Sequence, residues 1–204
     1  MVEPIVSALI IATAKTLTGV QPRWRGCAPA STQRIYFANH TSHMDFILVW
    51  SALPPRLRAT TRPVAAADYW TRGALKPYLI HRVFRGVLVD RGRVNRQANP
   101  MTPMLDALAA GDSLILFPEG TRGPGDELLP FRSGIFHVAR ARPDVELVPV
   151  WIANSSRVMP KGAMLPIPLL CSVTFGQPTR LDPPEDKPSF LARLRQSLLD
   201  LEGS

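Results

Sequence analysis

The stretch Ser113–Arg122, with the sequence SLILFPEGTR, carries the clearest indication of the fold. Its first five residues are apolar enough to form a strand that is buried on both faces. Pro118 and Gly120 then require the chain to leave the sheet sharply, since proline interrupts a strand and glycine tolerates a tight turn. Open α/β sheets bind their ligands just beyond the ends of such strands. The polar residues of this turn are therefore candidates for a binding site.

A second stretch has the same organisation. Residues Arg34–Ala38 predict a short buried strand, and Asn39–Asp45, with the sequence NHTSHMD, follows it. We expect His40 in the entry loop and Asp45 in the first turn of the next helix. The carboxylate can then accept from one imidazole nitrogen, which leaves the other nitrogen free to take a proton from an alcohol. In the alternative interpretation, Asp45 and Ser42 only form a capping box for the helix.

Helical and strand patterns alternate along the rest of the chain. This alternation predicts an α/β fold: a single-domain αβ sandwich with a mixed sheet flanked by helices and an N-terminal interfacial helix. We expect strands at 34–38, 64–67, 87–89, 113–117, 147–152 and 172–175, and helices at 42–53, 75–83, 102–110, 133–141 and 189–201.

The charge of the chain is concentrated in one segment. The formal net charge is +8, and residues 56–96 contain ten Lys or Arg residues against two acidic ones. A basic face of this kind attracts polyanions: nucleic acid, anionic lipid headgroups or a phosphorylated cofactor. The alternative is an ordinary solvated face. The two cysteines, Cys27 and Cys171, form neither a disulfide framework nor a metal-binding spacing.

The N-terminus contains an apolar run, Ile5–Ala14, that is shorter than the roughly 20 residues needed to span a bilayer. Glu3 stands where a secretory signal would carry basic residues. We predict that residues 1–25 form a membrane-associating helix in the headgroup layer, with packing into the core as the alternative. A proline-interrupted apolar loop, Met159–Leu170, is a second candidate for membrane contact.

Five segments together resemble the signature blocks of the glycerolipid acyltransferases. Asn39–Asp45 resembles the His-x4-Asp signature, and Phe117–Arg122 matches the third block residue for residue. Gly86–Arg91 resembles the second block, Phe131–Gly134 the Phe-Lys-x-Gly that follows the third, and Val148–Val150 the fourth. The ordered set is far more specific than any single block.

The resemblance implies an acyltransferase domain over residues 26–204, with its blocks within 35–152. Such an enzyme moves a fatty acyl group from coenzyme A or acyl carrier protein to the free hydroxyl of a lysophospholipid, here 1-acyl-glycerol-3-phosphate. It implies no metal and no bound cofactor, with His40 as general base and Asp45 orienting it. The residues that bind the acyl acceptor would be Arg91, Glu119, Gly120, Thr121 and Arg122.

The resemblance also implies partners and a location. We expect contact with membrane phospholipid, peripheral or monotopic attachment at the cytoplasmic face, and no nucleic-acid partner. One alternative is the same chemistry on a lyso-ornithine lipid or a glycolipid. Another is a metal-dependent phosphoesterase that uses His40, His43 and Asp45. The metal content of the purified protein would distinguish it from an acyltransferase, which needs no metal. A third is a non-catalytic basic module, which gives no reason for the His40 and Asp45 pair.

Overall fold

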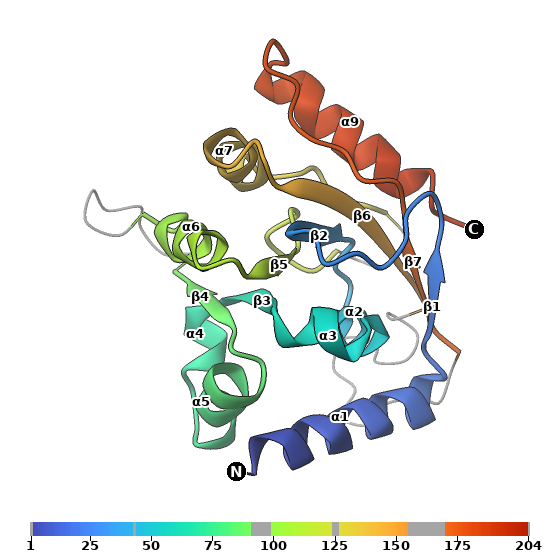
Figure 1. The fold of residues 1–204 in the computed structure, drawn as a ribbon, viewed down its shortest axis with the longest axis vertical. Coiled ribbons are helices and arrows are strands. Elements are labelled where there is room, and N and C mark those ends of the chain that lie inside the picture. Colours follow the sequence, from blue (N-terminus) through green and yellow to red (C-terminus); the bar gives the residue numbers. More distant parts are fainter. Residues whose placement is uncertain (1, 43, 91–98, 124–126, 155–169, 204) are drawn as a thin grey trace.

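The computed structural model describes residues 2–42, 44–90, 99–123, 127–154 and 170–203. Its centre is one mixed sheet of seven strands in the order β1-β7-β6-β2-β5-β3-β4 (Figure 1). The strands are β1 (Gln21–Trp24), β2 (Arg34–Ala38), β3 (Thr61–Ala66), β4 (Val87–Val89), β5 (Ser113–Leu116), β6 (Glu146–Ala153) and β7 (Ser172–Phe175). The α/β fold with a mixed, helix-flanked sheet that the sequence predicts is confirmed.

The sheet is parallel except for the β6–β7 pair, which is antiparallel. Strand β2 lies at the centre, between β5 and β6, and runs parallel to both. Its residues alternate between the two faces of the sheet. Tyr36 and Ala38 belong to one hydrophobic cluster, whereas Ile35 and Phe37 belong to the other. A strand buried on both faces explains why this segment is a continuous apolar run.

Helices cover both faces of the sheet (Figure 1). On one side lie α1 (Glu3–Thr18), α2 (Asp45–Ala52), α3 (Pro55–Ala59), α4 (Ala67–Trp70), α5 (Leu75–Tyr78) and the π-helix η1 (Leu79–Val83). On the other lie α6 (Thr102–Ala109), α7 (Gly134–Ala141) and α9 (Lys187–Leu199). Each layer buries the apolar side chains of its own face, so the site at the strand ends rests on two packed cores.

The N-terminal segment differs in part from expectation. A helix forms there, but Gln21–Trp24 is strand β1, which pairs in parallel with β7. The ring of Trp24 stacks on Phe175 with centroids 4.0 Å apart, and this contact helps to hold the edge strand. The sheet therefore begins within the segment 1–25. Of the apolar loop Met159–Leu170, only Leu170 lies within the described residues.

Two further elements were not predicted. Pro54 and Pro55 end α2 as expected, but Pro55 also begins α3, because proline is well suited to the first turn of a helix. Strand β3 begins at Thr61 rather than Val64 and runs directly into the short helix α4.

Several arginines of the basic segment serve the fold. The Arg58 guanidinium donates to the carbonyl oxygens of Trp50, Ser51 and Leu53 at the end of α2. Arg62 and Arg85 both lie within 3.5 Å of the Asp112 carboxylate. Fewer basic side chains of this segment are therefore available on the surface than its composition suggests.

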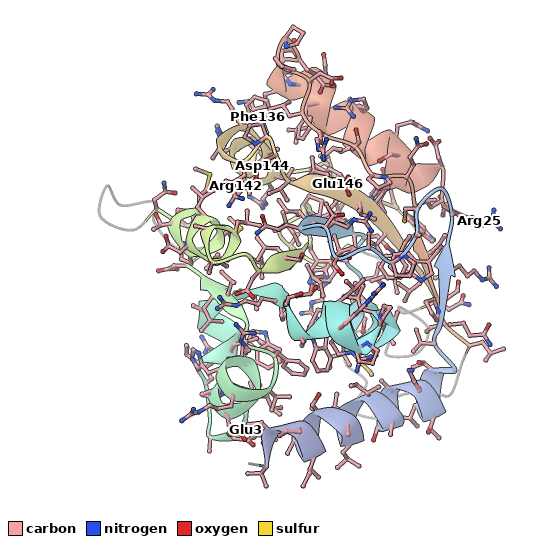
Figure 2. The ribbon with its side chains drawn as sticks, in the orientation of Figure 1. Glu3, Arg25, Phe136, Arg142, Asp144 and Glu146 are labelled. Atoms are coloured by element: carbon pink, nitrogen blue, oxygen red, sulfur yellow. The ribbon has the colours of Figure 1, made fainter. Side chains whose placement is uncertain are left out.

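The amino ends of the strands are also held by ion pairs. Arg34 at the start of β2 pairs with Glu146 at the start of β6 at 3.0 Å. Arg142 and Asp144 pair at 2.8 Å in the turn that leads into β6, close to Glu146 in the view of Figure 2. These charged side chains pair with one another at the amino ends of the strands, whereas both motif turns follow the carboxyl ends.

Candidate active site

The two motif turns meet at the carboxyl edge of the sheet. His40 follows the end of β2 by two residues, and Glu119 follows the end of β5 by three. Because β2 and β5 are adjacent and parallel, both turns emerge at the same edge. The carboxyl edge is where open α/β sheets bind their ligands. The fold thus brings together two stretches that are almost eighty residues apart.

His40 and Asp45 form the pair that the sequence predicts. The Nδ1 atom of His40 lies 2.8 Å from Oδ2 of Asp45. The Asp45 side chain is completely buried, whereas that of His40 is 23% exposed. A carboxylate at Nδ1 favours the tautomer that carries its proton there, which leaves Nε2 as an acceptor. The pair therefore has the geometry of a general base, and the catalytic roles themselves stay predictions.

Asp45 also fixes the turn that carries the histidine. Its Oδ2 atom accepts hydrogen bonds from the backbone N–H groups of Thr41, at 2.7 Å, and Ser42, at 2.8 Å. Ser42 in turn accepts from the N–H of Met44 through its hydroxyl at 3.3 Å. The capping and catalytic interpretations of Asp45 are therefore compatible, since one carboxylate makes both sets of contacts.

Glu119 has contacts that differ from those of an open ligand-binding carboxylate. It is only 3% exposed. Its Oε1 accepts from the N–H of His40 at 2.7 Å, and its Oε2 from the N–H of Leu129 at 2.9 Å. Burial raises the pKa of Glu119 above its usual range, against the lowering effect of these two bonds. Its contact with an acyl acceptor stays a prediction.

The turn after Glu119 is shaped by a glycine. Gly120 has φ +69°, and a side chain there would meet Arg132, whose Cδ lies 2.5 Å from the position of an added Cβ. The Nε of Arg132 donates to the Glu119 carbonyl oxygen at 3.2 Å. Arg132, Thr121 and Arg122 are all exposed. Arg132 comes from the segment before α7, so two exposed arginines lie at or beside this turn, and guanidinium groups suit a phosphate.

Not every predicted site residue can be placed. Arg91 lies outside the described residues, as does His43. Among the described residues, no group of three or more His, Cys, Asp or Glu side chains is arranged to hold a metal ion. The metal alternative, which needs His43, is therefore left to a measurement of metal content.

Two supporting residues were missed in the sequence. The Asn39 amide donates to the carbonyl oxygen of Ile152 at 3.0 Å and accepts from its N–H at 2.8 Å. The ring of Phe117 stacks on that of His40 with centroids 4.3 Å apart. The available signal was their position, an amide directly before the histidine and an aromatic ring at a strand end. Their partners depend on strand pairing, which local sequence does not specify.

Known proteins with similar sequences are acyltransferases. The sequence model of the family described as Acyltransferase matches residues 23–153. The human 1-acyl-sn-glycerol-3-phosphate acyltransferase alpha is 28% identical over 198 residues, covering 94% of this chain and 67% of that protein. A lyso-ornithine lipid O-acyltransferase of Brucella abortus is 30% identical over 108 residues, covering 51% of this chain and 36% of that protein.

A solved structure has the same fold. The 1-acyl-sn-glycerophosphate acyltransferase of Thermotoga maritima superimposes with a TM-score of 0.74 at 22% sequence identity. The match covers 98% of this chain and 80% of the other. The family match spans more than half of the chain and includes both motif turns. The chain therefore belongs to the acyltransferase family.

Proposed function

We propose that this protein transfers a fatty acyl group from an acyl thioester to the free hydroxyl of 1-acyl-sn-glycerol-3-phosphate, which gives phosphatidic acid. The observation that carries the proposal is the contact of 2.8 Å between His40 Nδ1 and Asp45 Oδ2, which leaves Nε2 free to act as a base. The names of the human and Thermotoga maritima relatives support the choice of acceptor.

The reaction needs no covalent acyl-enzyme. Nε2 of His40 takes the proton of the acceptor hydroxyl while the hydroxyl oxygen bonds to the thioester carbonyl carbon. The resulting oxyanion collapses, the carbon–sulfur bond breaks, and the thiolate leaves with the proton that the imidazolium returns. General-base help is worth about 10²–10⁴ in rate, so positioning of the two substrates must contribute the rest.

The acceptor phosphate would bind at the turn after β5. We assign it to Thr121 and Arg122, with close backbone approach at Gly120, and to Arg91 as the sequence predicts. A planar guanidinium can form two parallel hydrogen bonds with a phosphate. Arg132, from the segment before α7, bonds to the Glu119 carbonyl in this turn and is a further candidate for this contact.

The name of the Brucella abortus relative makes a lyso-ornithine lipid the second candidate acceptor. The test is to incubate purified protein with a panel of lysolipids and with both coenzyme A and acyl carrier protein thioesters. We expect the highest kcat/KM with lysophosphatidic acid and no transfer by the His40→Ala variant. Preference for an acceptor without a phosphate would refute the assignment, and wild-type turnover by folded His40→Ala would refute the mechanism.

We also propose that helix α1 attaches the protein to one leaflet at the cytoplasmic face. Along the described part of the chain, no helix is both long and apolar enough to cross a membrane. Helix α1 nevertheless exposes apolar side chains at helical spacing: Val2 is 59% exposed, Ile5 68% and Leu9 65%. Its other face packs on the core through Val6 and Ile10. An exposed apolar face on a packed helix suits the headgroup layer.

Substitution on this face tests the attachment more cleanly than truncation. Removing residues 1–20 would also delete the buried Ala14 and Thr18. The variant Ile5→Glu/Leu9→Glu changes the exposed face alone, and we expect it to release most protein in a vesicle flotation assay. A matched control, Ala192→Glu/Gln196→Glu, adds the same charge to the exposed face of α9, which lies on the opposite side of the sheet from α1 in Figure 1. Full flotation of the α1 variant would refute the proposal.

A further inference from the structure

The turn that carries His40 presents three successive backbone N–H groups to carboxylates. Those of Thr41 and Ser42 point to Asp45 Oδ2, and that of His40 itself points to Glu119 Oε1 at 2.7 Å. Consecutive N–H groups of this kind form a concave site with strong preference for negative charge. Two buried carboxylates thus satisfy the turn, one from α2 and one from the segment after β5.

The segment after β5 contacts His40 at three different points. The ring of Phe117 stacks on the imidazole, and Glu119 accepts from the His40 N–H. The N–H of Gly123 donates to the His40 carbonyl oxygen at 2.7 Å. Both polar groups of the His40 backbone and one face of its ring are therefore held by residues 117–123.

Glu119 is itself anchored on its far side. Its second oxygen accepts from the N–H of Leu129, and the neighbouring carbonyl of Leu128 accepts from Arg195 of α9 at 2.8 Å. The carboxylate therefore connects the His40 turn to a loop that the C-terminal helix holds in place. A side chain with one oxygen on each of two loops acts as a cross-link between them.

From these contacts we infer that Glu119 is a positioning residue, which fixes the backbone of His40 so that Nε2 faces the acceptor hydroxyl. The inference rests on the proposed function only in taking His40 as the base. A carboxylate that is 3% exposed and bonded to backbone at both oxygens has little surface left for a substrate. Acceptor contacts would then belong to the exposed residues that follow it.

Glu119→Gln is the direct test, because glutamine has the same shape but only one oxygen. Its NH₂ group must face one of the two backbone N–H groups, so one loop is released. Misplacing a catalytic group by about 1 Å costs about 100-fold in rate, so we expect kcat to fall about 10–100-fold. KM for the lysolipid should change less than about threefold. Glu127→Gln is the matched control, since Glu127 is an exposed carboxylate in the loop beside Leu128; it should behave as wild type.

Amide NMR supplies a second readout, and its measurement on the wild-type protein does not depend on the variant folding. A short bond to a carboxylate should move the His40 amide proton far downfield and slow its exchange in the wild-type protein. In folded Glu119→Gln this resonance should move upfield.

Three outcomes would overturn the inference. These are a freely exchanging His40 amide in wild type, an unchanged amide resonance in folded Glu119→Gln, or an unchanged kcat in that variant, whether or not KM rises. Failure of the proposed function is distinguishable, because it shows as absence of acyl transfer by the wild-type protein.

Discussion

Replacing Asp45 with asparagine separates the geometric and the electrostatic contributions of this residue. Oδ2 of Asp45 accepts from His40 Nδ1 and from the backbone N–H groups of Thr41 and Ser42. The two backbone donors require an acceptor at that position, so the amide oxygen should stay there and the amide nitrogen should replace Oδ1. The orientation of the imidazole is then retained, and the loss is mainly one of negative charge.

The magnitude follows from the charges involved. In the proposed mechanism an imidazolium forms as His40 takes the hydroxyl proton. With the centres of the two charges about 4 Å apart, the carboxylate stabilises it by up to about 4 kcal/mol at an effective dielectric constant of 20. Since about 1.4 kcal/mol corresponds to a factor of ten, kcat should fall about 10²–10³-fold. Stability should fall by about 1–3 kcal/mol, because the new amide nitrogen would be buried where Oδ1 has no partner among the described residues.

The assay compares kcat and thermal unfolding of Asp45→Asn with those of Asp45→Ala. Alanine leaves the N–H groups of Thr41 and Ser42 without their acceptor, so this variant should be both slower and less stable than the asparagine variant. Equal kcat in the two variants, at equal folded fractions, would show that the amide does not preserve the geometry. Wild-type kcat in Asp45→Asn would show that the charge has no catalytic role.

Three further predictions concern the turn after β5 and a buried thiol. Arg122→Ala should raise KM for lysophosphatidic acid about tenfold and leave KM for the thioester unchanged, whereas Arg140→Ala, at an exposed arginine of α7, should have no effect. Gly120→Ala should lower kcat/KM by displacing the Arg132 side chain, and Gly120→Ala/Arg132→Ala should cost less than the two changes added. Burial, with a smaller contribution from Asp45, raises the pKa of Cys171 to about 11, so its alkylation by iodoacetamide should be negligible at pH 8, increase with pH, and become rapid on unfolding.

The fold could be predicted where the signal is local. Strands β2 and β5 are apolar runs that end in polar turns, and both were located within one residue. Strand β1 could not be predicted, because QPRW is polar and contains proline. It is a strand because β7 offers it a parallel partner and Phe175 offers Trp24 a stacking surface. Such an edge strand depends on tertiary contacts rather than on propensity.

The candidate site was predictable to a similar extent. The contact between His40 and Asp45 is local, so a spacing of five residues was enough to indicate it. The bond between His40 and Glu119 joins residues 79 positions apart and exists because β2 and β5 are adjacent. The sequence shows a carboxylate beside a glycine and an arginine, which is typical of a ligand site. It does not show that the N–H of His40 already uses that carboxylate.

Burial separates the two kinds of residue in this site. Asp45 and Glu119 are buried and bonded to the backbone of the His40 turn, so in the proposed mechanism they position the base. Thr121, Arg122 and Arg132 are exposed on the same edge, so they can meet an acceptor that arrives from outside. Changes in the buried pair should therefore alter kcat for every acceptor alike. Changes in the exposed set should alter KM and the choice among acceptors, which is the property in which phosphate-bearing and other lysolipids differ.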